Sequence, residues 1–308
     1  MNKENAQSIS AEIIRLDQRA DIGLSWDCDG FALSSRGLKS RTLCLDGERS
    51  ATQVWHSKQD NALSEYLDSH VEEQISPTTH SLYKLFGAYI GAALHGPDEK
   101  ARPNVLDVGC GIGRMQPLYM RKLKERVNYF GLDAFDINLD RDYPFICARI
   151  EDLSKIEAFH NKIDTFIFGT SLDHFENLDE VAEAVKKLAS PGAVIIFWIG
   201  LHDVVLVAGE EGARAFQRVF DGAGLLSAAW RFLRFAFWNF PRMAYVLRRR
   251  GDKLKRGENL DDLHFWYFTE KDLPGVLSRF GEITDISMLP GNNSVFCTCR
   301  VPSADAEK

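Results

Sequence analysis

The stretch Asn104-Val105-Leu106-Asp107-Val108-Gly109-Cys110-Gly111-Ile112-Gly113-Arg114 decides the fold of this 308-residue chain. Apolar or β-branched residues lead into an aspartate, and three glycines then alternate with other residues before a stretch compatible with a helix. That order predicts a buried strand, a tight turn and the start of a helix. Glycine is used where a Cβ would block the close approach of a ligand to the backbone, so the turn is predicted to line a binding site.

The glycine spacing distinguishes this turn from a dinucleotide-binding loop. The pyrophosphate fingerprint is G-x-G-x-x-G, which aims a helix N-terminus at phosphate, whereas this chain has G-x-G-x-G with an aspartate two positions earlier. This form resembles the first motif of class I S-adenosylmethionine-dependent methyltransferases, where the turn surrounds the amino-acid and ribose portion of the cofactor. The resemblance implies that Asp107 helps to hold the cofactor's amino group. It also implies backbone contacts to the cofactor from Gly109, Cys110, Gly111 and Gly113.

Composition narrows the class of protein. An apolar fraction of 45% is that of an ordinary globular chain, and the formal net charge of -7 disfavours a general nucleic-acid binder. The six cysteines form no C-x-x-C pair, so free thiols in a reducing cytosol are expected. Residues 1–10 lack the apolar core of a signal peptide, and no apolar run is long enough to predict a spanning helix. We expect a cytoplasmic protein, bound if anywhere at the inner face of a membrane.

Strands and helices alternate from residue 104 onward. Helical spacing, as over 181–188, separates strands predicted at 104–109, 128–133, 145–150, 164–169 and 193–200. This alternation predicts a parallel sheet covered by helices on both faces. A final hairpin of strands at 283–289 and 294–301 adds one antiparallel strand near the C-terminus. The expected fold class is α/β, a Rossmann-like doubly wound sheet, mostly parallel, which again resembles the class I methyltransferases.

The regions outside this alternation define the expected domains. Residues 1–60 mix both charge signs with short β-like pieces at 42–45 and 52–55, so we expect an N-terminal extension or small cap. Apolar residues recur at helical spacing over 61–95, and Pro77 divides that stretch into two helices. The methyltransferase domain is expected to span 61–200 and 262–302, separated by an insertion at 201–261.

Two further motifs are candidate cofactor contacts. Asp133 ends a predicted strand, where a carboxylate can accept hydrogen bonds from vicinal ribose hydroxyls; the alternative is an aspartate that caps a helix. Similar enzymes carry an adenine-binding aspartate where this chain has Arg149. That departure leaves backbone groups near Ile150 and Glu151, or the side chains of Glu151 and Asp152, as the candidates for the adenine contact.

The candidate catalytic residues follow the strand that ends at Gly169. Thr170 and Ser171 lie at the binding edge of the predicted sheet, so we expect both to contact the cofactor. His174 is the first candidate for general base, because an unperturbed histidine titrates near neutral pH. Asp173 precedes it, and His264 is a second group expected at the acceptor. The alternative for either histidine is a packing or substrate-lining role.

The Asp173-His174 pair also resembles the acidic–histidine pair that binds a metal in some quinone-biosynthesis O-methyltransferases. The match is incomplete, so the sequence leads us to expect no metal.

The insertion interleaves aromatic and basic residues. Its segment 223–256 holds seven arginines, two lysines and one aspartate, together with two phenylalanines or tryptophans before Phe235 and three after it. This pattern suits a lid over a hydrophobic or anionic acceptor, an interfacial helix on anionic lipid, or a nucleic-acid surface, the last being least expected. The plain alternative is a helical insertion that packs on the domain. Pro241 and the arginines argue against a spanning helix.

Together these features predict an S-adenosylmethionine-dependent methyltransferase. The expected acceptor is a small molecule or a lipid- or glycan-linked intermediate, and the expected reaction is O-methylation. Peripheral membrane contact is expected through 223–256, and nucleic acid is not an expected partner. The alternatives from other classes are a non-catalytic cofactor-binding partner subunit and a peripheral membrane protein built on the same fold.

Overall fold

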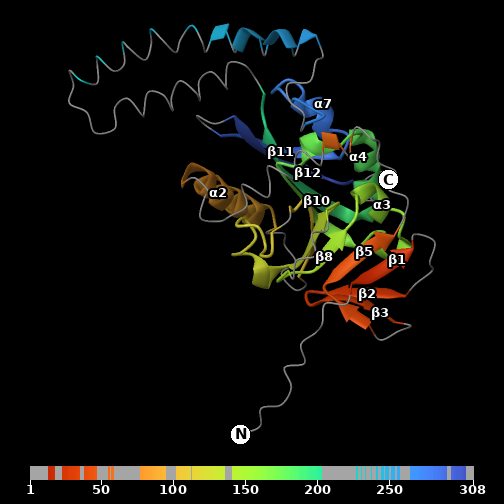
Figure 1. Cartoon of the computed structure of the whole chain (residues 1–308). Helices are drawn as coiled ribbons and strands as arrows, with labels where there is room; N and C mark the ends of the chain where they lie inside the picture. Colours follow the sequence, from red (N-terminus) through yellow and green to blue (C-terminus); the bar gives the residue numbers. More distant parts are fainter. Residues whose placement is uncertain are drawn as a thin grey trace.

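Figure 1 shows the protein as a computed structural model. The structure describes residues 13–17, 23–34, 38–46, 55, 57–58, 77–94, 102–111, 113–135, 141–202, 264–289 and 293–302, together with scattered positions between 227 and 256. The predicted helix over 61–76 lies outside these residues, as do residues 52–54 of the β-like piece predicted at 52–55. Its remaining residue, Trp55, is helical and not extended.

A nine-stranded sheet forms the centre of the molecule, in the order β1-β5-β8-β7-β6-β9-β10-β12-β11. Its strands are β1 (Ile14–Asp17), β5 (Thr42–Asp46), β6 (Asn104–Val108), β7 (Asn128–Asp133), β8 (Phe145–Cys147), β9 (Ile163–Gly169), β10 (Ala189–Gly200), β11 (Glu282–Met288) and β12 (Ser294–Arg300). All neighbours pair in parallel except β12, which is antiparallel to β10 and β11. The predicted mostly parallel sheet with one antiparallel C-terminal strand is confirmed.

Helices cover both faces of this sheet, with α2 on one side and α3 and α4 on the other (Figure 1). The helical elements are α2 (Pro77–Ala93), η2 (Lys124–Arg126), α3 (Ile150–Leu153), η3 (Glu157–Phe159), η4 (Leu172–His174), α4 (Leu178–Leu188) and α7 (Leu273–Leu277). Consecutive residues of β6 point to opposite faces: Val105 packs in the cluster with α2, and Leu106 packs in the cluster with α4. The doubly wound arrangement therefore has two cores, one on each face.

Two expected boundaries differ from the structure, and the helix start predicted directly after the glycine turn is wrong. Residues 113–123 form turns and bends, and the next described helical element is η2. The strand expected over 145–150 ends at Cys147, because the chain turns into α3 at Ile150. The strand expected from 193 begins at Ala189, directly after α4, and its register against β9 shifts between Ala189 and Val194. That irregularity accommodates Pro191, which has no amide hydrogen for the ladder.

The N-terminal residues contribute to the central sheet. Strands β1 and β5 extend it beyond β8, and only the stretch at 42–45 had a strand-like signal in the sequence. A separate antiparallel sheet contains β2 (Leu24–Asp27), β3 (Gly30–Leu33) and β4 (Leu38–Ser40). Trp26 stacks on Phe159, and Phe31 lies against Phe130. The described part of residues 1–60 thus packs on the α3 side of the domain.

The insertion contributes few described residues. Among them, Trp230 is 70% exposed and Phe237 is 77% exposed. Within the described part of the chain, no helix is both long and apolar enough to cross a membrane. The lid, membrane, nucleic-acid and packing interpretations of 223–256 stay predictions.

The turn after β6 needs its glycines. Gly109 has φ +74° and Gly111 has φ +81°, in the left-handed region that other residues rarely adopt. A Cβ on Gly109 would lie 2.5 Å from the Cβ of Ser171, which follows β9. The glycine therefore allows the turn to approach the neighbouring strand end.

We expect Gly109→Ala to lower the free energy of unfolding by about 1–3 kcal/mol, because it combines an unfavourable φ with a steric clash. Gly275→Ala is the matched control, since an added Cβ there meets nothing within 4 Å. The control should be neutral or stabilising by at most about 1 kcal/mol. Urea denaturation measures both variants, and equal effects would contradict the proposed role of Gly109.

Candidate active site

The predicted site residues gather at one edge of the sheet. Strand β6 pairs with β7 on one side and β9 on the other, so the carboxyl ends of the three strands are neighbours. The glycine turn, Asp133 and the segment 170–174 follow these three ends. In open α/β sheets ligands bind at this edge.

Asp133 fixes the glycine turn. Its Oδ2 accepts a hydrogen bond from the Gly111 amide at 2.9 Å, and its Oδ1 accepts one from the Phe135 amide at 3.1 Å. A carboxylate oxygen can accept more than one bond, so both oxygens keep capacity for the hydroxyls of a ribose. Burial raises the pKa of Asp133, against the lowering effect of these amides.

Three amides of the glycine turn already have partners within the protein. The amides of Gly109 and Cys110 both donate to the Leu132 carbonyl, at 2.8 and 3.1 Å, and the Gly111 amide is held by Asp133. Because these amide donors are engaged, the turn suits a ligand that itself donates hydrogen bonds, such as an ammonium group. Burial raises the pKa of the Cys110 thiol, which disfavours the reactive thiolate.

Asp107 lies below the turn, fully buried at the centre of the sheet. Its Oδ2 accepts hydrogen bonds from the hydroxyls of Tyr119 at 2.8 Å and Tyr129 at 2.7 Å. Its Oδ1 has no hydrogen-bond partner among the residues that the structure describes. Burial raises the pKa of Asp107 to about 7, although the two tyrosines act in the opposite direction. The buried acceptor atom fits a cofactor with an amino group, reached directly or through water.

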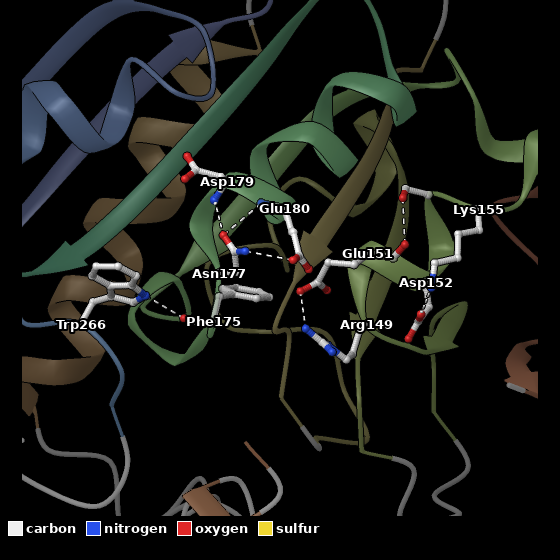
Figure 2. A network of polar contacts seen from close by, with 10 residues as sticks. Arg149, Glu151, Asp152, Lys155, Phe175, Asn177, Asp179, Glu180 and Trp266 are labelled. Atoms are coloured by element: carbon white, nitrogen blue, oxygen red, sulfur yellow. Dashed lines mark hydrogen bonds and ion pairs between the residues drawn. The ribbon is translucent and has the colours of Figure 1, made fainter. Parts of the chain in front are cut away.

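The charged side chains of the motif at 149–152 form ion pairs within the protein. The Glu151 carboxylate lies 2.6 Å from the Arg149 guanidinium, and Asp152 lies 2.7 Å from the Lys155 ammonium (Figure 2). Burial raises the pKa of Glu151 against the effect of Arg149. Ile150 is part of the core on the α4 side. Glu151 Oε2 has no hydrogen-bond partner among the residues that the structure describes. Backbone groups near Ile150 and Glu151 and the side chains of Glu151 and Asp152 all stay predictions for the adenine contact.

Aromatic contacts of Trp55 lie near the Asp133 end of the site, and the sequence did not predict them. The Trp55 ring stacks on the Phe135 ring with a centroid distance of 6.3 Å and an angle of 15°. The Arg149 guanidinium lies 5.5 Å from the centre of the Trp55 ring. Lys58 donates from Nζ to the His264 carbonyl at 2.8 Å. Trp55 and Lys58 therefore connect the Asp133 end of the site to the His264 end.

Ser171 and Thr170 take different positions after β9. The Ser171 hydroxyl is buried and donates to the Val108 carbonyl at 2.6 Å, which ties β9 to the strand before the glycine turn. Thr170 is exposed and has φ +62°, an outlying conformation for a β-branched residue. Such strained residues cluster at functional sites. Cofactor contact by either residue stays a prediction.

The three predicted catalytic residues meet. His174 Nε2 lies 3.9 Å from Asp173 Oδ1, and His264 Nε2 lies 3.7 Å from Asp173 Oδ2. The two imidazole rings are 4.7 Å apart between centroids. One carboxylate thus faces two histidines that are 90 positions apart in the chain, and we call these three residues the acceptor cluster.

Main-chain hydrogen bonds hold the acceptor cluster together. The Asp173 carbonyl accepts from the Phe265 amide at 2.8 Å. The Trp266 indole donates to the Phe175 carbonyl at 2.8 Å (Figure 2). The His202 amide donates to the Phe268 carbonyl at 2.7 Å. These bonds fix the segment 264–268 against the ends of β9 and β10. His202 adds a third imidazole, 6.0 Å from the His264 ring, that sequence reasoning did not identify.

The fold and this site define an α/β enzyme that binds its ligands across the carboxyl ends of parallel strands. A family model described as a methyltransferase domain matches residues 82–281. The chain therefore belongs to this methyltransferase family, which confirms the resemblance drawn from the glycine motif. It is an S-adenosylmethionine-dependent methyltransferase, and Asp107 and Asp133 fit that cofactor.

Several solved structures are similar to this chain at low sequence identity. The 1,6-didemethyltoxoflavin-N1-methyltransferase of Burkholderia thailandensis is 14% identical with a TM-score of 0.49, covering 84% of this chain and 93% of that one. The N-methyltransferase NodS of Bradyrhizobium japonicum WM9 is 12% identical with a TM-score of 0.43, covering 79% and 98%. A methyltransferase from Archaeoglobus fulgidus is 13% identical with a TM-score of 0.41, covering 71% and 94%. No curated protein matches the chain.

The buried Asp107 predicts a pH dependence of stability. Its pKa is about 7 in the folded chain and ordinarily 3.8, so between these values the folded chain holds a proton that the unfolded chain has lost. Stability should therefore fall as the pH rises from about 4 to about 7, by at most about 1.4 kcal/mol per pH unit.

Asp107→Asn should flatten this profile, because the amide does not titrate. Urea denaturation across this pH range measures the slope, with Asp285→Asn on the exposed strand β11 as the control. A slope in Asp107→Asn as steep as in the wild type would show that Asp107 is not the titrating group.

Proposed function

We propose that this methyltransferase methylates a hydroxyl group of a small-molecule or lipid- or glycan-linked acceptor at the acceptor cluster. The observation that carries the proposal is the meeting of His174 and His264 on one carboxylate, at the sheet edge that also holds Asp133 and the glycine turn. Donor and acceptor sites would then be neighbours, as direct transfer requires.

Each part of the site has a distinct task in this proposal. S-adenosylmethionine supplies an electrophilic methyl group on a sulfonium sulfur. Asp133 binds the ribose, and Asp107 and the turn carbonyls receive the amino group. The buried Trp55 and Lys58 cover the site and limit the access of water.

His174 is the proposed general base. Its ring is 15% exposed, so it is accessible from the sheet edge and largely shielded from solvent. When the acceptor oxygen loses its proton to His174, the Asp173 carboxylate stabilises the imidazolium that forms. His264 lies on the other oxygen of Asp173 and holds that carboxylate in place.

Other acceptor atoms remain as alternatives. Neighbouring structures in the comparison include N-methyltransferases and the CurJ carbon methyltransferase. An amine acceptor would also need a proton removed. In the alternative class, a non-catalytic subunit, the protein would bind the cofactor without turnover. The exposed Trp230 and Phe237, in a segment rich in arginine, favour a lipid-linked acceptor and contact with the inner face of a membrane.

Methyl-labelled cofactor, incubated with cell fractions, tests this function. We expect label in the lipid or small-molecule fraction with the wild type. His174→Ala should slow transfer by about 100-fold or more, because a positioned base contributes at least that factor, while cofactor affinity stays unchanged.

His80→Ala, on α2, is the matched histidine control and should transfer label at the wild-type rate. Cofactor binding with no label in any fraction would favour the non-catalytic alternative. Undiminished transfer by His174→Ala would remove the base assignment.

A further inference from the structure

The acceptor cluster has the composition of a metal site. Asp173, His174 and His264 each offer a ligand atom, and these atoms all lie within 4.8 Å of one another. Two imidazoles and one carboxylate form a common protein ligand set for zinc and related divalent ions. Among the described residues, no other three histidine, cysteine or acidic side chains bring their ligand atoms this close together.

The distances are close to those that zinc requires. Ligand atoms about 2.0–2.2 Å from a tetrahedral zinc ion are about 3.4 Å from one another. The Asp173 carboxylate lies 3.9 Å from His174 Nε2 through Oδ1 and 3.7 Å from His264 Nε2 through Oδ2. Small side-chain rotations would therefore complete the geometry without a change in the backbone.

The backbone around the three ligands is already fixed. The Asp173 carbonyl binds the Phe265 amide, next to His264, and the His174 amide donates to the Ser171 carbonyl at 3.1 Å. Ligand-bearing segments that are held by such bonds lose little freedom when an ion binds. The side chains are 13–23% exposed, so an ion would have access from solvent and yet be mostly desolvated.

We propose that Asp173, His174 and His264 bind one zinc ion, with a coordination position left open toward the acceptor. Three protein ligands with one open position is the arrangement of catalytic rather than structural zinc sites. The sequence alone leads to the opposite expectation, because the Asp173-His174 pair matches the metal-binding pair of the quinone-biosynthesis enzymes only in part. The structure supplies the third ligand.

The ion would act on the acceptor hydroxyl. A hydroxyl oxygen bound to zinc loses its proton to water more readily, since the ion stabilises the oxyanion that remains. His174 Nε2 cannot bind zinc and accept a proton at once, so in the zinc-loaded enzyme the ion replaces His174 as the group that promotes deprotonation. This role in methyl transfer rests on the proposed function, whereas zinc binding itself does not.

Zinc titration of the full-length, chelator-treated protein tests the site. Calorimetry should give one zinc ion per chain for the wild type and for His80→Ala. His174→Ala and His264→Ala should each weaken binding by more than about 100-fold, because loss of a ligand costs more than loss of an outer-shell contact. Cobalt(II) as a probe should give weak visible bands without the intense thiolate absorption that the cysteines would produce.

Two controls keep the outcomes distinct. Zinc should raise the melting temperature of the wild type and leave that of the two histidine variants unchanged, and S-adenosylhomocysteine binding should show that all variants are folded. No stoichiometric zinc binding, or binding that persists in both histidine variants, would overturn the metal site. Loss of cofactor binding in the wild type would instead contradict the proposed function and leave the zinc result standing.

Discussion

The hydrogen bond from the Gly111 amide to the Asp133 carboxylate is the contact on which the site depends. It joins the turn after β6 to the end of β7, two strands that are already paired in parallel. Gly109 lets the same turn approach Ser171 after β9, so three strand ends form one surface. The sheet order therefore creates a cofactor site, because side chains distant in the sequence follow adjacent strands.

The two ends of this surface differ chemically. At the Asp107 and Asp133 end, buried carboxylates accept hydrogen bonds from tyrosine hydroxyls and backbone amides, and our proposal assigns to them the amino group and the ribose of the cofactor. At the other end, one carboxylate faces two imidazoles, a combination that can remove a proton or bind a divalent ion. Trp55 stacks on Phe135 at the first end and Lys58 donates to the His264 carbonyl at the second, so two residues that are three positions apart contact both ends.

The sequence predicts features that depend on local patterns. The buried strand β6, the carboxylate at the end of β7 and the C-terminal hairpin each have a short signature, and the structure confirms these elements. Features that depend on distant partners were missed. Strand β1 is too short for a periodic signal, and Trp55 acquires its role only by packing on Phe135. Likewise, each residue of the acceptor cluster could be selected from its motif, but their common site required the fold.

Calorimetric titration with S-adenosylhomocysteine tests the central claim most directly. The wild type should bind, and Asp285→Ala, on the exposed β11, should bind equally well. Asp133→Ala should bind at least about 100-fold more weakly, since it loses bonds to a charged acceptor worth about 1.5–3 kcal/mol each and releases the glycine turn. An affinity of Asp133→Ala equal to that of the wild type would contradict the placement of the cofactor across the ends of β6 and β7.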